Sequence, residues 1–399
     1  MSKVISVNCG SSSLKFQLFN MPSEEVLTSG IAECIGLEKG GKFVIKVNGE
    51  KIVKEVDLKD HKVAVGILLN LLEELGVVGT LDEINAAGHR VVQGASKFKG
   101  SVLVDEESIA AVEEFSELAP LHNPANLVGY YAFKEALPNI KHTFVFDTAF
   151  HQTMPEDSYI YPVPYSWYQD HKVRRYGAHG TSHLYVSHRT IELMGLENKP
   201  SKIITLHLGN GASICAVKDG LSVNTSMGFT PLAGVMMGTR SGNIDPAIIP
   251  YMGAKLNKSA QEIIDILNKE SGMLGVSGMS SDARVIEEAA LNGEERAILT
   301  HKVYVNSIIN IIGGYAMQMG GVDAITFTAG LGENDTLIRE KILKACEEFL
   351  GLELDYELNS KTRGKEVKLS KDNSKVAVYI VPTDEEVMIA RDTFRLINE

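Results

Sequence analysis

Two glycine-containing turns in the sequence combine residue types that bind phosphate. Residues 8–15 read Asn-Cys-Gly-Ser-Ser-Ser-Leu-Lys, and residues 207–213 read His-Leu-Gly-Asn-Gly-Ala-Ser. Each turn lies between two apolar, strand-like runs, so each is predicted to form a β-hairpin whose backbone amides and hydroxyls can approach an anion. Lys15, at the end of the first turn, can meet phosphate oxygens. A plain hairpin would explain either turn alone, but the shared pattern favours two phosphate-binding turns.

The spacing of the two turns indicates a duplicated domain. His207 follows Asn8 by half the length of the 399-residue chain, which is the offset that duplication of one domain leaves behind. Two facing turns of this kind are suited to hold a nucleotide between two related domains.

A third glycine-rich run, residues 327–334, reads Phe-Thr-Ala-Gly-Leu-Gly-Glu-Asn. It follows a predicted strand and opens a predicted helix over residues 335–346. The amides at the start of that helix, with the open backbone of Gly330 and Gly332, can cover a nucleotide. The spacing is not the GxGxxG of a dinucleotide-binding fold, and the sequence contains no GxxxxGK[ST] run, which excludes a P-loop NTPase.

Two arginines have neighbours that favour a partly buried role over a surface ion pair. Arg90 precedes Val-Val in a strand-like segment, and Arg240 lies in residues 236–242, which read Met-Met-Gly-Thr-Arg-Ser-Gly. A guanidinium in such a place can bind a carboxylate or a phosphate through paired hydrogen bonds.

The histidines lack the spacing of a zinc site, so hydrogen bonding to an anionic transition state is the better interpretation of them. His179 lies in the glycine-containing residues 177–183 and is the most suggestive, whereas His183 is explained equally by capping or packing.

Two carboxylates stand at predicted strand ends. Asp147 and Glu385 are in positions that suit magnesium held through water. A helix cap explains the neighbouring Thr383 and Asp384 about as well.

Composition narrows the class of protein. The chain has 39 basic and 51 acidic residues, a formal net charge of -12 and no block of Lys and Arg, so we expect neither a nucleic-acid nor a membrane partner. No secretory leader and no apolar run long enough to span a bilayer are found. The four cysteines have no CxxC spacing and are interpreted as reduced thiols. These features predict a cytoplasmic protein.

Alternating strand and helix patterns predict an α/β fold. The first domain is predicted over residues 1–149 and the second over residues 150–384, with a C-terminal helix, residues 385–399, that packs back on the first domain. Residues 159–165, followed by residues 172–177, carry prolines and aromatic residues without a helical period and are predicted to be a loop or domain junction. Predicted strands of the first domain are residues 26–35, 42–47, 51–56, 86–92 and 142–147, and its predicted helices are 63–75 and 109–118. In the second domain, strands are predicted at residues 221–224, 324–328 and 376–381, and a helix at 297–319.

With these residues assembled, the chain resembles the acetate kinases, the acetokinase family within the acetate and sugar kinase, Hsp70 and actin superfamily. The resemblance runs essentially end to end and implies two duplicated actin-like, ribonuclease H-like domains around a nucleotide cleft. The segments that match the family in order are residues 8–15, 88–92, 121–124, 146–151, 179–183, 207–211, 225–231, 236–242, 330–334 and 385–386.

The resemblance implies reversible transfer of a phosphoryl group from ATP to acetate, in line and with magnesium, giving acetyl phosphate and ADP. Manganese is the alternative ion, and a homodimer is implied. Catalytic roles fall on Asp147, His179 and Arg240, and metal binding on Asn8 and Glu385. Acetate-binding positions are Arg90, Val92, Leu121 and Pro231. Nucleotide-binding positions are Lys15, His207, Leu208, Gly209, Asn210, Gly211, Asp282, Ala283, Arg284, Gly330, Leu331, Gly332, Glu333 and Asn334.

Acetate is already ionised at neutral pH, so a general base is chemically unnecessary. Asp147 is therefore predicted to orient either metal-bound water or an arginine, and we expect Asp147→Asn to lose turnover and magnesium response together.

The chain departs from the family pattern at Ala178, where a bulky aromatic residue usually precedes the histidine. A wider acyl pocket and appreciable use of propionate are expected from this departure. The alternative functions are a propionate or butyrate kinase, an Hsp70- or actin-like ATP-driven switch, and a metabolite-binding protein without catalysis.

Overall fold

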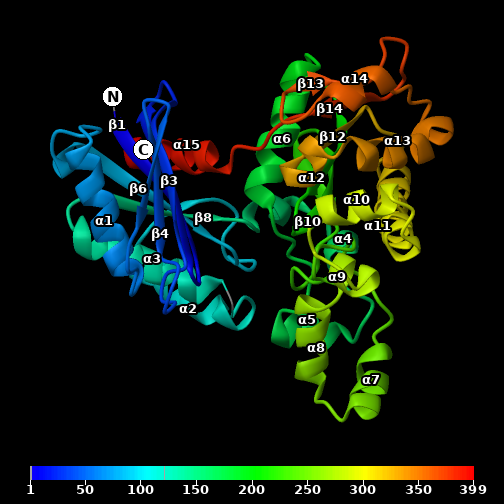
Figure 1. Ribbon diagram of the computed structural model, residues 1–399, viewed down its shortest axis with the longest axis horizontal. Helices are drawn as coiled ribbons and strands as arrows, with labels where there is room; N and C mark the ends of the chain where they lie inside the picture. Colours follow the sequence, from blue (N-terminus) through cyan, green and yellow to red (C-terminus); the bar gives the residue numbers. More distant parts are fainter. Residues whose placement is uncertain (1, 121) are drawn as a thin grey trace. The chain divides into compact units, whose positions relative to one another are not determined.

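The computed structural model describes residues 2–120 and 122–399, and these form two compact units. Unit 1 contains the residues up to Phe150 together with Asp384–Glu399, and unit 2 is His151–Thr383. Figure 1 labels the elements of each unit along the colour gradient of the sequence. Of the predicted site residues, Leu121 lies outside the described residues.

Unit 1 is built on an eight-stranded sheet of order β5-β4-β3-β2-β1-β6-β8-β7. β1 to β5 are antiparallel, whereas β1, β6 and β8 run parallel to one another. The bounds are β1 Ser2–Gly10, β2 Ser13–Met21, β3 Glu25–Glu33, β4 Lys42–Val47, β5 Glu50–Glu55, β6 Ile84–Val91, β7 Val102–Leu103 and β8 Lys141–Phe146. Parallel neighbours end at the same edge of the sheet, so side chains that follow β6 and β8 are brought together.

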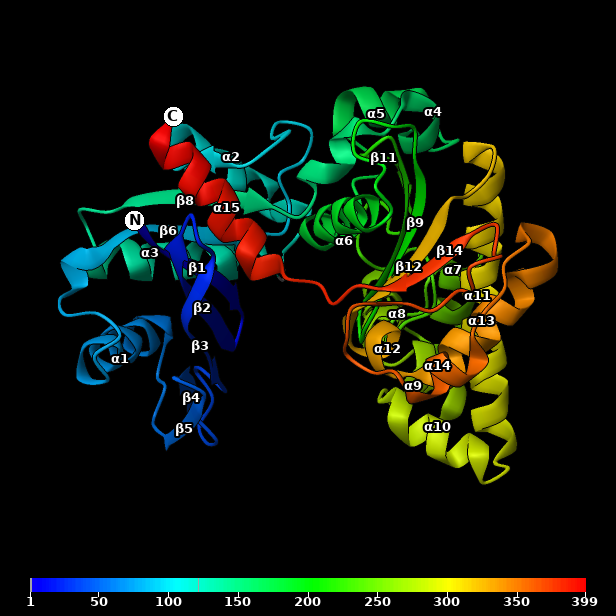
Figure 2. The same ribbon diagram turned by 90° about the horizontal axis from the view of Figure 1, so that it is seen from above.

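Successive strand residues point to opposite sides of the sheet, so each face has side chains against which helices can pack. Helices cover both faces of this sheet. Ile5 and Ala87 pack in the core with residues of α1 and α3. A side chain at Gly88, the next residue, would meet Ile389 and Thr393 of α15. Figure 2 shows α15 lying across the strands of this unit. The helices are α1 His61–Glu74, α2 Glu106–Glu114, α3 Asn123–Ala136 and α15 Glu385–Asn398, with short 3-10 turns at Leu81–Glu83, Phe115–Glu117 and Ala149–Thr153.

Unit 2 repeats the strand order on a six-stranded sheet, β11-β10-β9-β12-β14-β13. Its hairpin and third strand, followed by two parallel strands, correspond to β3-β2-β1-β6-β8 of unit 1. The bounds are β9 Lys202–Leu208, β10 Ala212–Lys218, β11 Leu221–Thr225, β12 Ala324–Thr328, β13 Val367–Lys368 and β14 Ala377–Ile380. The shared order is what duplication of one domain produces, and the predicted fold class is confirmed.

Strand alternation again separates two layers of helices in unit 2. Thr326 on β12 is hydrogen-bonded to Thr190 of α6, whereas Ile325 belongs to the apolar core that includes Ile308 of α11. Figure 2 shows α6 and α11 on opposite sides of these strands. The helices are α4 Glu156–Tyr159, α5 Tyr165–His171, α6 Gly180–Leu193, α7 Ile248–Leu256, α8 Ala260–Lys269, α9 Gly272–Ser277, α10 Ala283–Leu291, α11 Glu295–Met319, α12 Ala329–Asn334, α13 Thr336–Leu350 and α14 Tyr356–Lys361.

The two predicted loop segments, residues 159–165 and 172–177, are separated by a short helix that was not predicted. This helix, α5, forms over Tyr165–His171 and ends at Lys172 in the left-handed region, with φ of 57°. One local prediction was wrong, because the glycine-rich residues 330–334 are already helical before the predicted helix at residue 335. They form their own short helix α12, and Asp335 then caps α13 through the amide of Ile338.

Candidate active site

Arg90 and Asp147 form a bidentate ion pair in unit 1. Nε of Arg90 donates to Oδ1 of Asp147 at 2.9 Å, and an Nη2 hydrogen goes to Oδ2 at 2.5 Å. The carboxylate side chain is only 2% exposed and the guanidinium 21%. Burial by itself would lower the pKa of Arg90, but the charge and hydrogen bonds of Asp147 outweigh it and raise that pKa. Arg90 is therefore a cation of fixed orientation whose side chain still reaches the surface.

The sheet register explains how this pair forms. β6 and β8 are parallel neighbours with Val91 opposite Phe146, and the amide of Asp147 continues the ladder by donating to the carbonyl of Val91 at 3.0 Å. Two residues that are far apart in the sequence are thus held at one sheet edge.

Asn8, Lys15 and Arg90 lie on the sheet face that α15 covers. Asn8 is paired with Lys15 across the first hairpin, and alternation from Ser6, which is opposite Gly88, puts Asn8 on the side of Gly88 and Arg90. Lys15 forms an ion pair with Glu386, the second residue of α15.

Glu385, the first residue of α15, lies close enough to Arg90 and Asp147 for their charges to act on it. Burial raises the pKa of its carboxyl group. The cation of Arg90 opposes that rise, whereas Asp147 adds to it. Asp384 has the capping role that the sequence left open, because its side chain accepts from the amide of Val387. Predicted metal, acetate and phosphate residues of this unit are thus neighbours.

Two asparagines of α3, neither of them predicted as a site residue, hold the loop after β6. The amide of Val92 donates to Oδ1 of Asn126 at 3.1 Å, and Nδ2 of Asn126 donates to the carbonyl of Cys9 at 2.7 Å. Asn123 likewise accepts from the amide of Gln93 at 3.0 Å. Both asparagines are buried on α3. Their three-residue spacing on a helix face that is otherwise apolar was the available signal.

In unit 2, His179 sits at the N-cap of α6 with a left-handed backbone, φ 56°. Such a conformation is costly for a residue with a side chain and is retained where the surroundings enforce it, often at functional sites. The ring of His179 stacks on that of His207, with centroids 4.1 Å apart, and its Nδ1 is 2.8 Å from Oγ of Ser213. The predicted residues His179 and His207 are brought together.

Arg240 lies on a loop that backbone hydrogen bonds anchor to α9. The amide of Met273 donates to the carbonyl of Met237 at 2.8 Å, and that of Leu274 to Gly238 at 2.9 Å. Nη1 of Arg240 donates to the carbonyl of Pro231 at 3.2 Å, so these two predicted residues are in contact. Burial lowers the pKa of Arg240.

Arg240 and His179 both lie close to Gly211. A Cβ atom on this glycine would lie 3.6 Å from Nε2 of His179 and 3.7 Å from Nη1 of Arg240. Two donor groups therefore flank the turn of the second hairpin, where an anion would gain from both.

The three predicted nucleotide segments converge in unit 2. A Cβ on Gly209 would lie 3.8 Å from that of Ala329 at the start of α12. A Cβ on Gly238 would overlap Oδ1 of Asn210 and come within 3.2 Å of the carbonyl of Ser281, just before α10. The hairpin turn, the start of α10 and α12 therefore lie side by side.

Within these segments, two acidic residues have local partners. Oε1 of Glu333 accepts from the amide of Ala329 at 2.8 Å, and burial raises the pKa of Glu333. Asp282 accepts from the amide of Arg284, as a helix cap does, and also pairs with the guanidinium of Arg284. Arg284 is mostly exposed, so it can turn toward a ligand without breaking packing.

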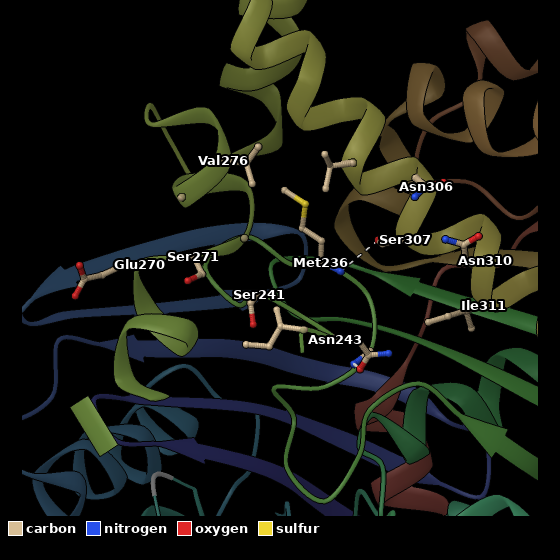
Figure 3. A pocket seen from close by; sticks show the side chains of 15 residues that line it. Met236, Ser241, Asn243, Glu270, Ser271, Val276, Asn306, Ser307, Asn310 and Ile311 are labelled. Carbon is tan, nitrogen blue, oxygen red and sulfur yellow. Dashed lines mark hydrogen bonds between the residues drawn. The ribbon is translucent and has the colours of Figure 1, made fainter. Parts of the chain in front are cut away.

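A pocket of about 690 Å³ lies behind the Arg240 loop. Figure 3 shows Met236, Ser241, Asn243 and Glu270 around it, with Ser307 hydrogen-bonded to the amide of Met236. Its lining has no lysine or arginine and includes none of the predicted site residues. A polyphosphate would have no counter-charge there, so this pocket is not the candidate nucleotide site.

Among residues 2–120 and 122–399, no group of three or more His, Cys, Asp or Glu side chains is arranged to hold a metal ion. No helix in the described part of the chain is long and apolar enough to cross a membrane.

Comparisons with known proteins agree with this architecture. The model of the acetokinase family matches residues 3–391. The acetate kinase of Anoxybacillus flavithermus is 58% identical over 398 residues, which cover 100% of both chains. The acetate kinase of Bacillus subtilis is 57% identical over 396 residues, 99% of this chain and 100% of the relative.

Solved structures are similar over the same length. The crystal structure of Porphyromonas gingivalis acetate kinase has a TM-score of 0.94 at 49% identity and covers 100% of both chains. That of a propionate kinase from Francisella tularensis has a TM-score of 0.92 at 40% identity, over 99% of this chain and 100% of the other. The chain is thus a kinase with the actin-like two-domain fold. It belongs to the acetokinase family.

Proposed function

We propose that the protein transfers the terminal phosphoryl group of ATP to acetate, giving acetyl phosphate and ADP, and catalyses the reverse reaction. The observation that supports a carboxylate such as acetate as the phosphoryl acceptor is the Arg90–Asp147 ion pair. A guanidinium has five N–H donors, and among the described residues Asp147 engages two of those of Arg90. The remaining donors offer a fixed cradle for a carboxylate, which an ATP-driven switch without a small acidic substrate would not need.

The acetate site is proposed to consist of Arg90 with the apolar residues Val92, Leu121 and Pro231. Val92 is 7% exposed and its amide is held by Asn126, so this part of the wall is rigid. A methyl group buried against such residues adds to the ionic attraction of Arg90 for the carboxylate.

Arg240 and His179 are proposed to stabilise the transition state. In the transition state of the transfer, negative charge spreads over the equatorial oxygens of the phosphoryl group. Fixed hydrogen-bond donors around these oxygens lower the activation barrier. The two side chains flank Gly211, and the Arg240 loop is anchored by α9. Donors held in place before the reaction need no reorganisation when the charge develops. Asp147 is proposed to act through Arg90, as an orienting group.

The nucleotide is proposed to bind along the hairpin turn His207–Gly211, the α10 start and α12, with Lys15 near its phosphates. The residues at the start of α10 are the N-cap Asp282 with Ala283 and Arg284, and those of α12 are Gly330, Leu331, Gly332, Glu333 and Asn334. Open glycine backbone and helix-start amides are suited to phosphate and ribose.

Asn8 and Glu385 fit a magnesium ion as donors. Magnesium takes oxygen ligands, keeps several waters and is usually held by one or two carboxylates with substrate phosphates. A single carboxylate and an amide oxygen beside the Arg90–Asp147 pair match that pattern better than a closed protein cage would. When bound, the ion would neutralise phosphate charge.

The test is a steady-state assay of ADP formation with magnesium. We expect ADP to form only with acetate present, and hydroxylamine to trap acetyl phosphate in equal amount. ADP formation at the same rate without acetate would contradict the proposal and favour an ATP-driven switch. Omission of magnesium with added EDTA is the matched control for the metal.

A second candidate substrate is propionate. Ala178 replaces a larger residue of the family pattern, and one similar structure is of a propionate kinase. However, the Ala178 side chain is 4% exposed within the core of unit 2, so its small size can be taken up by packing. The ratio of kcat/KM for acetate and propionate decides, because one methylene is worth about 10- to 200-fold. A ratio above about 100 contradicts the propionate expectation.

The protein is further proposed to be a cytoplasmic homodimer. Helix α7 supports self-association, because Gly253 is its one buried residue. Ile248, Tyr251 and Leu256 expose 40%, 63% and 48% of their surfaces. Apolar side chains gathered on one short helix favour contact with a second protein surface.

A further inference from the structure

A continuous line of hydrogen bonds leads from β9 to His179. Oγ1 of Thr205 is 2.7 Å from Nδ1 of His183. Nε2 of His183 is 2.7 Å from Oγ of Ser213, and that oxygen is 2.8 Å from Nδ1 of His179. Thr205, His183 and Ser213 are all fully buried. Each hydroxyl and each neutral imidazole has one hydrogen to donate along such a chain, so all its bonds must run in the same direction.

Thr205 decides that direction. In the described part of the chain, the bond to His183 is the one hydrogen bond of its hydroxyl. If His183 donated to Thr205, the threonine hydrogen would be buried without an acceptor, which is unfavourable. If Thr205 donates instead, every member is satisfied. Thr205 then donates to Nδ1 of His183, Nε2–H of His183 donates to Ser213, and Ser213 donates to Nδ1 of His179.

We propose that Thr205, His183 and Ser213 are positioning residues that keep Nδ1 of His179 an acceptor and its hydrogen on Nε2. The inference rests on the proposed role of His179 in phosphoryl transfer. Nε2 is the ring nitrogen that lies beside Gly211, on the side of Nη1 of Arg240. With the hydrogen there, His179 presents a neutral donor next to the arginine, and no proton has to be rearranged when charge develops on the phosphoryl group.

The surroundings of this line of hydrogen bonds favour neutral imidazole rings. Burial lowers the pKa of His183 well below its ordinary value, and the neighbouring His151 and His207 add to this. His151 has its own partners, Ser222 and the carbonyl of Ala178.

The tautomer is measured directly by NMR on protein labelled with ¹⁵N-histidine, the His179 signals being assigned by their loss in His179→Gln. In the unaltered protein we expect Nδ1 of His179 to give the resonance of an unprotonated nitrogen and Nε2 that of a protonated one. A protonated Nδ1 overturns the proposal. This measurement needs no substrate, so it is independent of the proposed function.

Thr205→Val and Thr205→Ser form the matched pair of variants. Valine keeps the shape and removes the hydroxyl, whereas serine keeps the hydroxyl. We expect Thr205→Val to give mixed His179 tautomers and to lower kcat about three- to tenfold, with KM for ATP and acetate within about twofold. Thr205→Ser should restore both signals and kcat. Ser213→Ala, which removes the direct donor, should lower kcat further, about tenfold or more.

Circular dichroism and the thermal midpoint establish that each variant is folded before these comparisons. An unchanged His179 tautomer in Thr205→Val overturns the proposed direction of the hydrogen bonds. A changed tautomer with kcat equal to that of Thr205→Ser overturns the positioning role. Failure of the proposed function would instead appear as absence of acetate-dependent ADP formation in the unaltered protein.

Discussion

Arg90 and Asp147 face each other through two hydrogen bonds although 57 residues separate them in the chain. Their contact follows from the parallel register of β6 and β8, which ends both strands at one edge of the sheet. A paired guanidinium is fixed in direction as well as charge. The geometry favours the orientation of an arginine over the orientation of metal-bound water as the role of Asp147.

Replacement of Asp147 by asparagine keeps the shape but removes the charge and one acceptor. We expect kcat to fall about 10²-fold and KM for acetate to rise about tenfold or more, because Arg90 loses its fixed orientation. Titrations of acetate and of magnesium in the same assay measure both effects. Arg90→Lys, which cannot form the fork, should raise the acetate KM in a similar way.

The magnesium titration separates the two roles of Asp147. A weakened response to magnesium in Asp147→Asn would support the metal-linked role expected from the sequence. An unchanged acetate KM would contradict the role through Arg90.

Arg240→Lys should lower kcat about 10²- to 10³-fold with little change in either KM. The lysine keeps the charge but cannot keep the planar fork, and a donor used only in the transition state affects kcat selectively. Arg189→Lys is the control, since Arg189 forms exposed ion pairs with Glu192 and Glu366. A large rise of the ATP KM at unchanged kcat would show that Arg240 serves ground-state binding instead.

Buried histidines predict loss of stability in mild acid. Burial lowers the pKa of His301 from 6.5 to about 4, and that of His142 also to about 4. The unfolded chain therefore binds more protons, so the free energy of unfolding is fully present above pH 6.5 and falls as the pH drops toward 4. Each group adds up to about 1.4 kcal/mol per pH unit to the slope.

Urea unfolding at several pH values between 7 and 4.5 measures this slope. His301→Gln should make it shallower by about one proton, and the variant should lose less stability on acidification than the unaltered protein. Equal slopes for the two proteins would show that His301 does not contribute.

Charge on α7 should disrupt self-association. Tyr251→Glu combined with Ile248→Glu places carboxylates on the exposed apolar side of the helix, and desolvating them in an interface is unfavourable. Light scattering after size exclusion should show a dimer for the unaltered protein and a monomer for the double variant. The same substitution at the exposed Leu291 on α10 is a control for added charge. A monomer in both proteins would refute the homodimer.

Local patterns were sufficient to find most strands of the fold. The predicted strands at residues 42–47 and 324–328 are β4 and β12 at their observed bounds. Periodicity reports burial of one face, which is why these strands were found. It gave no signal over residues 165–171, where α5 has no buried residue and hence no apolar stripe to detect.

The sequence by itself determined the chemistry that is available: a repeated hairpin turn, two arginines with apolar neighbours, and glycines where backbone must approach a ligand. These are properties of residue type and short spacing, which the chain carries before it folds. Only the tertiary structure decided which side chains meet. Asp147 turned to Arg90, Asn126 to Val92, and Ser213 came to lie between two histidines, because sheet register and helix packing set distances between residues that no local pattern relates.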